Sequence, residues 1–191
     1  MQISRTEAAF VILNRIQEIK SRTGSCTVAV DGNSGAGKTT LAAQLAAASG
    51  AALFHMDDFF LPPELRTPER LASPGGNIDA ERFLKEIIAG ISRGGAFFYR
   101  AFSCGDCTYS KRYAPDSAVR ILEGVYSTHP AWQNRLDLKI FLCVSPPVQQ
   151  ERILHRNGAE QLRNFTEKWI PMENRYFDFY KIREICDYIV M

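Results

Sequence analysis

The chain has 191 residues, of which 46% are hydrophobic and 23% charged, with a formal net charge of +2. This length is enough for one globular domain with a sizeable core and too short for two. The balanced charge gives no electrostatic reason to expect nucleic-acid binding, and no stretch of 18 apolar residues is available to span a membrane. We therefore expect one domain over residues 1–191 and neither nucleic acid nor a membrane as its partner.

The N-terminus and the cysteines both indicate a cytoplasmic protein. The apolar run 10–13 is too short for a secretion signal, and the odd count of five cysteines favours free thiols. Cys104 and Cys107 form a C-x-x-C pair without a second pair at zinc-site spacing. A turn with two incidental thiols is the favoured interpretation, and a redox dithiol or half a metal site is the alternative. The oligomeric state cannot be read from the sequence.

In chain order, the first predicted element is an amphipathic helix over 5–22, with apolar residues at 8, 9, 12, 13, 16 and 19. A β-prone run at 26–31 follows and leads directly into a glycine-rich segment at 32–40. Helix-forming residues at 39–48 lead out of it. A strand followed by a glycine loop and a helix is the local structure that a phosphate-binding loop needs.

Residues 32–40 form a complete G-x-x-x-x-G-K-[ST] motif in that setting. Its glycines let backbone N–H groups approach phosphate oxygens, and the helix N-terminus adds partial positive charge. Lys38 would reach the β- and γ-phosphates, while the Thr39 hydroxyl would bind Mg²⁺. The chain is expected to bind ATP or GTP. The binding residues expected from the motif are Gly32, Asn33, Ser34, Gly35, Ala36, Gly37, Lys38, Thr39 and Thr40.

A predicted strand at 51–56 leads into two adjacent carboxylates, Asp57 and Asp58. A carboxylate at a strand end can accept the proton of an attacking hydroxyl if it lies within about 3 Å of that group. A solvated turn is the alternative for such a pair. Phe59 and Phe60 follow and could stack on the ring of a substrate.

Residues 61–78 contain four prolines and two glycines and predict a long loop, which in a compact domain is usually functional. Asn77 or Asp79 can cap a helix that runs to about Ser92. The aromatic, turn-punctuated segment 97–113 predicts a small hairpin. Three of its residues are candidates for lining an acceptor pocket, with packing on the core as the alternative: Tyr99, Arg100 and Phe102.

A third strand, 118–125, carries Glu123 near its end. A carboxylate at the end of an apolar strand is costly unless it is paired or near a metal. Holding Mg²⁺ and capping the next segment are the two alternatives for Glu123.

A strand at 138–144 precedes a helix at 146–156, a polar break at 157–164, a mainly helical stretch at 165–183 and a short strand at 188–190. Arg152 and Arg156 share one helix face before the break. We expect them to close over a triphosphate, in a lid at about 152–165. The aromatic stripe of the following stretch predicts a core seam, formed by Phe165, Trp169, Met172, Tyr176 and Phe179.

Strands that alternate with helices predict βαβ crossovers, and hence an α/β fold with three α/β/α layers around a parallel sheet of about five strands. Ligands gather at the carboxyl ends of such strands. The segments 32–39, 57–58 and Glu123 all fall at such ends. Three separate signals therefore converge on one edge of the sheet.

Together, the segments 31–40, 55–60 and 123–124 and the arginine-bearing lid resemble the uridine kinase and phosphoribulokinase branch of P-loop kinases. The segment 57–60 is also similar to nicotinamide riboside kinases. The stretches 75–79 and 169–173 look like a bacterial uridine-kinase-like subgroup. The resemblance implies that Asp57 is the catalytic base, that Glu123 helps hold Mg²⁺, and that Arg152 and Arg156 are the lid arginines.

The chain departs from uridine kinases at two places. The aspartate that binds the ribose hydroxyls in that family is missing from 71–77, and the lid has Arg156-Asn157 where the family has Arg-Asp. Contacts to acceptor hydroxyls would then fall to Asn77, Asp79 or Arg100, with Asp58 and Phe59 close to the acceptor. The expected activity is transfer of the γ-phosphate of ATP to a nucleoside-like alcohol. The alternatives are a kinase for another alcohol, such as pantothenate or a sugar, and a regulatory NTPase.

Overall fold

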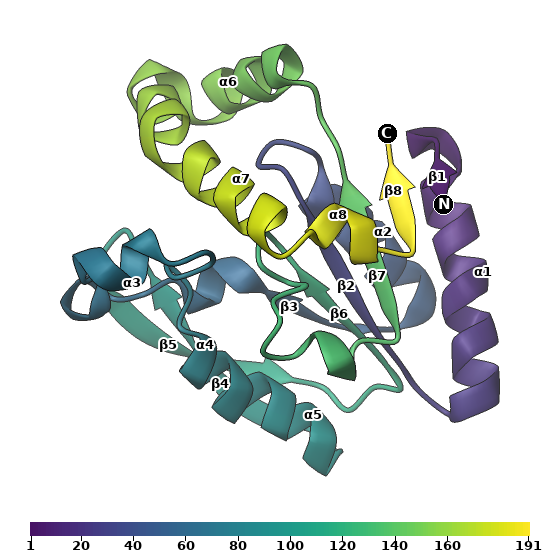
Figure 1. Ribbon diagram of the computed structural model, residues 1–191. Coiled ribbons are helices and arrows are strands. Elements are labelled where there is room, and N and C mark those ends of the chain that lie inside the picture. Colours follow the sequence, from purple (N-terminus) through teal and green to yellow (C-terminus); the bar gives the residue numbers. More distant parts are fainter.

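The structure, a computed structural model, describes all residues from 1 to 191. Figure 1 shows a twisted sheet with helices on both faces. All strand pairs in this sheet are parallel, in the order β1-β8-β7-β2-β6-β3. Its strands are β1 (Gln2–Ile3), β2 (Cys26–Gly32), β3 (Ala52–His55), β6 (Val119–Glu123), β7 (Leu138–Leu142) and β8 (Tyr188–Val190).

The predicted α/β class with three layers is confirmed, and the sheet has six strands where about five were predicted. The additional strand β1 has only two residues, which pair with Ile189 and Val190 of β8. Two residues are too few to show a hydrophobic period, so this strand depends on its partner rather than on a local pattern.

Helices α1 (Arg5–Thr23) and α2 (Lys38–Ser49) cover one face of the sheet. The Ser4 hydroxyl accepts a hydrogen bond from the backbone N–H of Glu7 at the start of α1, and Gly24 ends the helix in a left-handed conformation. Ile12 and Ile16 of α1 pack with Leu45 of α2 in the core under this face. The predicted helices at 5–22 and 39–48 are confirmed.

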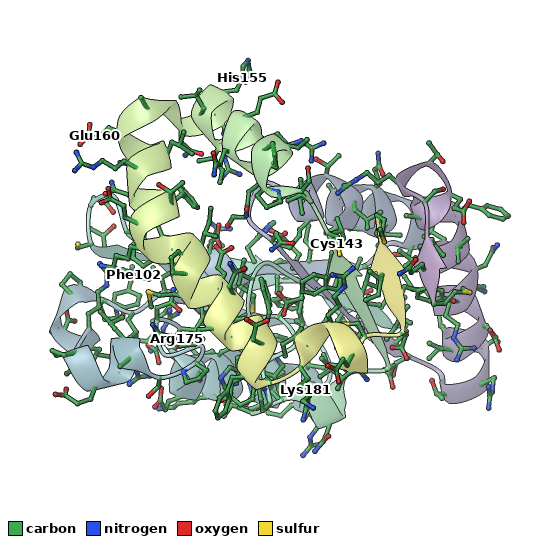
Figure 2. The ribbon with its side chains drawn as sticks, turned by 45° about the horizontal axis from the view of Figure 1, so that its top comes forward. Phe102, Cys143, His155, Glu160, Arg175 and Lys181 are labelled. Atoms are coloured by element: carbon green, nitrogen blue, oxygen red, sulfur yellow. The ribbon has the colours of Figure 1, made fainter.

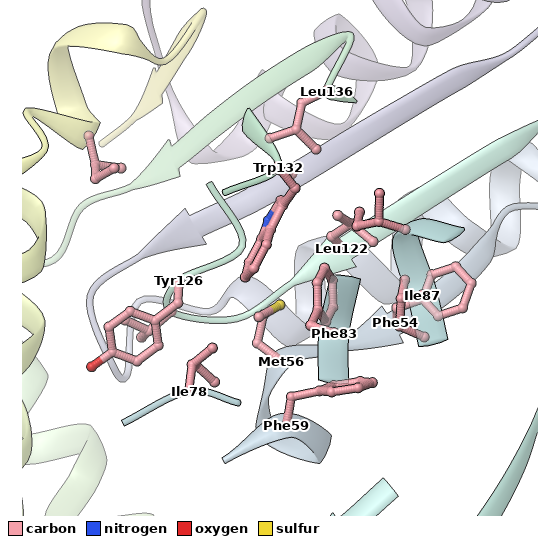
Figure 3. Close-up of a cluster of buried hydrophobic side chains, with 14 of the residues drawn as sticks. Phe54, Met56, Phe59, Ile78, Phe83, Ile87, Leu122, Tyr126, Trp132 and Leu136 are labelled. Carbon is pink, nitrogen blue, oxygen red and sulfur yellow. The ribbon is translucent and has the colours of Figure 1, made fainter. Parts of the chain in front are cut away.

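The opposite face is covered by α4 (Ala80–Phe83), α5 (Ala89–Arg93), α7 (Ile170–Phe179) and α8 (Ile182–Ile185). A π-helical turn joins α4 to α5 without a break. The helix predicted from about 79 to 92 is therefore confirmed as one continuous helical segment. Figure 3 shows the core on this side, where Phe83 lies between Phe59 and Trp132. The strands alternate between the two cores. In β2, Ala29 faces this core, whereas Val28 and Val30 face the other.

A hairpin lies beside the sheet, as predicted, formed by β4 (Phe97–Ser103) and β5 (Thr108–Ala114). The predicted loop at 61–78 is partly wrong, because it contains a short helix, α3 (Pro68–Ala72), which Thr67 caps. Short 3-10 turns occupy three further segments, Met56–Phe59, Pro63–Leu65 and Gln133–Arg135.

The last corrections concern α6 (Pro146–Asn164) and the aromatic stripe after it. The predicted break at 157–164 is a single non-helical residue, Gly158, because the residues on either side continue as helix. The seam prediction holds for Tyr176, which is fully buried, and fails for Phe179, which is 67% exposed. No helix of the structure has the length and apolar character needed to cross a membrane.

His129 lies against the rings of Trp132 and Tyr176, and its Nδ1 accepts a hydrogen bond from the backbone N–H of Ala131. Burial lowers the pKa of His129 from 6.5 to about 4. Between these values the unfolded chain binds the proton and the folded chain does not, so stability falls as the pH drops from 6.5 towards 4. We expect this one group to account for about 2–3 kcal/mol of the loss.

The measurement is urea unfolding of the wild type and of His129→Phe at pH 7 and pH 4.5. Both proteins contain the same carboxylates. The effect of the carboxylates on the free energy of unfolding therefore cancels when the wild type and the variant are compared. We expect the variant to lose less stability on acidification. An equal loss in both proteins would show that His129 is not protonated on unfolding.

Candidate active site

The carboxyl ends of β2, β3 and β6 open into a cavity of about 650 Å³. Its floor comes from the glycine loop and from the strand-end residues Asp57 and Glu123, and its roof comes from α6 and from the helical turn that leads to α7. The three sequence signals at strand ends therefore meet in one place. The glycine loop, Asp57 and Glu123 all line this cavity.

The backbone of the glycine loop adopts a conformation that residues with side chains could not adopt without strain or collision. Gly32 has φ of 130°, and a Cβ there would collide with the carbonyl oxygen of Leu142 in the neighbouring strand. Gly37 has φ of 92° at the N-terminus of α2. The loop thus turns back onto a helix N-terminus, which is the arrangement that binds phosphate through backbone N–H groups.

Lys38 is only 9% exposed and lies across the mouth of this loop. Its ammonium group donates to the carbonyl oxygens of Gly32 at 2.9 Å and Asn33 at 3.0 Å. An ammonium has three N–H donors, so one remains for a ligand in the cavity.

Thr39 and Glu123 lie together, as predicted. The Thr39 hydroxyl donates to the two carboxylate oxygens of Glu123 at 3.2 and 3.3 Å. His55 Nδ1 lies 2.7 Å from Glu123 Oε1, and this hydrogen bond raises the pKa of His55 against the effect of burial. A hydroxyl beside a buried carboxylate is the set of oxygen ligands that Mg²⁺ prefers, so these residues fit a magnesium ion.

Asp57 and Asp58 follow β3 but face different surroundings. Asp57 is exposed where it faces the cavity and enclosed by protein on its other sides. This partial loss of water, followed by the charge of Glu123, raises its pKa. A second cavity of about 370 Å³ lies beneath the hairpin, and Asp57 lines it as well. Asp57 therefore lies where the two cavities meet.

Asp58 is buried and engaged by the hairpin. Its carboxylate lies 3.2 Å from Arg112 Nη2 and accepts a hydrogen bond from the Tyr99 hydroxyl at 3.3 Å. Burial raises the pKa of Asp58, although Arg112 opposes the shift. Since its oxygens are already engaged, Asp58 is less suited than Asp57 to accept a proton from a substrate.

The lid arginines line the larger cavity from α6. Arg152 donates to the carbonyl oxygen of Gly35 at 3.0 Å, and Arg156 donates to the side chain of Asn157. In Figure 2, His155 and Glu160 mark the outer side of this helical segment. Both arginines are free of carboxylate partners, so their charge remains for an anionic ligand.

Glu173 of α7 is a site residue that the sequence did not indicate. It is 5% exposed, lines the larger cavity and accepts from the backbone N–H of Ser34 at 3.1 Å and from its hydroxyl at 2.5 Å. Burial raises the pKa of Glu173. Gln149 of α6 donates to the Ser34 carbonyl at 2.9 Å, so two helices hold this loop residue. The only available signal was spacing, since Trp169, Glu173 and Tyr176 share one helix face.

We expect Glu173→Ala to lower kcat/KM by about tenfold to hundredfold, because it leaves two donors of Ser34 without their partner and loosens the loop. Glu173→Gln keeps an acceptor oxygen, so it should lower kcat/KM less than Glu173→Ala does. Steady-state kinetics with Glu167→Ala as the control tests this, because Glu167 pairs only with Arg163 at the surface. Tighter ATP binding at unchanged kcat would show instead that Glu173 only competes with phosphate.

The other predicted substrate residues divide between cavity and core. Asn77 lines the larger cavity and Phe102 the smaller one. Asp79 caps α4 and pairs with Arg82 at 3.0 Å, outside both cavities. The remaining three are occupied elsewhere: Phe59 packs in the core, Tyr99 is buried against Asp58, and Arg100 pairs with Glu86.

Three further side chains missed by the sequence reasoning belong to the cavity walls. Phe165 and Trp169 of the predicted core seam line the larger cavity, because the helix that carries them passes over it. Cys104 lies in the hairpin turn and lines both cavities, while Cys107 is exposed. No group of residues in the chain is arranged to hold a metal through cysteine.

Comparison with known proteins gives one curated relative and several solved structures. No family model matches the chain. Uridine-cytidine kinase C from Dictyostelium discoideum is 26% identical over 189 residues, which cover 92% of this chain and 42% of the relative. The chain thus spans less than half the length of that relative.

Two solved structures share the fold along nearly the whole chain. A possible uridine kinase from Bacillus stearothermophilus is 20% identical with a TM-score of 0.73, covering 97% of this chain and 98% of its own. A candidate fructose transport system kinase from Silicibacter sp. TM1040 is 22% identical with a TM-score of 0.64, covering 93% and 97%. These two likenesses confirm the predicted fold class. The curated relative bears out the resemblance of this chain to uridine kinases.

Proposed function

We propose that this chain is an ATP-dependent small-molecule kinase that transfers the γ-phosphate to a hydroxyl of a nucleoside-like acceptor. The observation that carries the proposal is the place of Asp57, at the junction of a cavity floored by the glycine loop and a smaller cavity under the hairpin. A hydroxyl held near this junction would have a carboxylate on one side and the phosphate-binding loop on the other.

In this proposal the residues of the loop bind the triphosphate, with Thr39 and Glu123 as the residues that would hold Mg²⁺. The ion, when bound, would neutralise charge on the β- and γ-phosphates. Lys38 and the lid arginines Arg152 and Arg156 would stabilise the charge on the phosphoryl group during its transfer.

Asp57 would act as the general base. The acceptor oxygen forms a bond to the γ-phosphorus while the bond from that phosphorus to the β–γ bridging oxygen breaks. The hydroxyl proton passes to the Asp57 carboxylate, and ADP leaves with the electron pair of the broken bond. The Asp57 carboxylate has no hydrogen-bond partner in the chain and is exposed in the cavity, so its oxygens are free to accept this proton.

Support for a nucleoside-like acceptor comes from the name of the curated relative and from the aromatic walls of the cavity, Phe60, Phe165 and Trp169. We further propose that residues 1–191 form a single kinase domain that works in the cytoplasm on a small molecule.

The test is ADP release under saturating Mg-ATP with uridine, cytidine, nicotinamide riboside, their 2′-deoxy forms and pantothenate. We expect phosphorylation of at least one ribonucleoside, with the deoxy form reacting much more slowly. Activity on pantothenate or a simple sugar alone would contradict the nucleoside acceptor and leave the kinase proposal standing. ADP release that is independent of every acceptor would indicate an NTPase.

A further inference from the structure

Arg66 opens into the larger cavity without a counter-charge. Its Nε donates to the carbonyl oxygen of Leu61 at 2.7 Å, and its Nη2 lies 3.6 Å from Cys104 Sγ. It forms no ion pair, whereas Arg70, four residues later, pairs with Glu81 outside the cavity. A half-buried guanidinium that faces a cavity and has no carboxylate partner is suited to bind an anion.

Three acids line the larger cavity. Glu173 contacts Ser34 and Glu123 contacts Thr39 at the glycine loop, whereas Asp57 lies between Glu123 and Cys104 of the hairpin turn. Lys168 adds a second cation to the cavity lining, and its ammonium lies 4.6 Å from the Trp169 ring. Neither Arg66 nor Lys168 forms an ion pair with any of the three acids.

Arg66 is also placed on the acceptor side rather than the triphosphate side. Its contact Cys104 is at the hairpin turn and lines the smaller cavity as well as the larger one. The triphosphate side already has Lys38, Arg152 and Arg156 around the loop. A further cation at the hairpin turn is not needed to hold ATP.

We propose that the acceptor carries an anionic group, a carboxylate or a phosphate, in addition to its hydroxyls. Arg66 binds that group through its guanidinium. This inference rests on the proposed kinase function and narrows its acceptor from nucleoside-like alcohols to anionic ones.

The experiment compares compounds that differ only in this charge. Nicotinic acid riboside and nicotinamide riboside differ by a carboxylate in place of an amide, and ribose 5-phosphate with ribose forms the phosphate arm. Their kcat/KM values and their dissociation constants from calorimetry are measured for the wild type, Arg66→Gln and Arg70→Gln. Arg70→Gln is the matched control, since it removes a cation of the same segment that pairs with Glu81 and does not line the cavity.

We expect the wild type to prefer one anionic compound over its neutral partner by about tenfold to hundredfold, and Arg66→Gln to abolish that preference while Arg70→Gln keeps it. Preference for the carboxylate or for the phosphate identifies which anion is bound.

Equal or better use of the neutral partners would overturn the anionic acceptor while ADP release still supports the kinase. A rise in the KM for ATP in Arg66→Gln, without a change in acceptor preference, would assign Arg66 to the triphosphate and also overturn the inference. Failure of all four compounds to bind the folded wild type would also overturn the inference of an anionic acceptor. Circular dichroism spectra confirm that each variant is folded before it is compared.

Discussion

Lys38→Ala is expected to lower the rate of ATP-dependent phosphorylation by about 10³-fold or more while the protein stays folded. The Lys38 ammonium lies inside the glycine loop, and two of its N–H groups already donate to loop carbonyls. The variant therefore loses both the remaining donor for phosphate and the contact that shapes the loop. Removing a charge-stabilising donor from a water-poor site costs about 3–4 kcal/mol, which corresponds to this factor.

The measurement is ADP release with the best acceptor from the substrate panel, together with thermal unfolding of the same samples. Lys38 itself lines the cavity, so water can take the place of its ammonium at the carbonyls of Gly32 and Asn33, and we expect only a small loss of stability. Lys85→Ala is the control, because Lys85 is an exposed lysine outside the cavity. A folded Lys38→Ala protein with near-normal turnover would refute the kinase proposal.

Asp57→Asn is expected to lower kcat by about 10²- to 10⁴-fold and to change ATP affinity little, as for the loss of a general base. The amide has the same shape as the carboxylate and cannot accept the acceptor proton. Asp57 opens into both cavities and has no hydrogen-bond partner in the chain, so its replacement disturbs no structural contact.

The kcat of Asp57→Asn is compared with that of Asp58→Asn, which replaces the neighbouring carboxylate. Asp58 is paired with Arg112 and Tyr99, so its replacement should mainly weaken the contact between the 3-10 turn and the hairpin. We expect it to affect stability and the KM for the acceptor more than kcat. A large loss of kcat in Asp58→Asn with a mild effect in Asp57→Asn would show that Asp58 is the base.

The candidate site could be predicted from the sequence wherever its chemistry resides in a contiguous segment. The glycine loop needs its residue types in a fixed order, since only glycine tolerates the backbone at Gly32 and Gly37. Glu123 and Asp57 were found for a related reason, because polar residues at the ends of apolar strands gather at one edge of a parallel sheet. The hydrophobic periods likewise predicted five of the six strands of the sheet.

Side chains that enter the site from other elements could not be found in this way. The path of α6 and α7 across the cavity decides that Phe165 and Trp169 line a wall, although their spacing is that of a buried seam. The same path brings Glu173 to Ser34, 139 residues earlier in the chain. Conversely, Asp79 looked available for a substrate, and its carboxylate is used by the helix start and Arg82.

The sequence by itself determined the fold class, the phosphate-binding loop and the edge of the sheet where the chemistry lies, because these depend on local backbone demands and on short hydrophobic periods. Only the tertiary structure decided which polar side chains are free for a ligand, since that depends on partners far away in the chain. Arg66 differs from Arg70 and Asp79 in just this respect: Arg66 lines the cavity without an ion pair, whereas Arg70 and Asp79 are paired with Glu81 and Arg82.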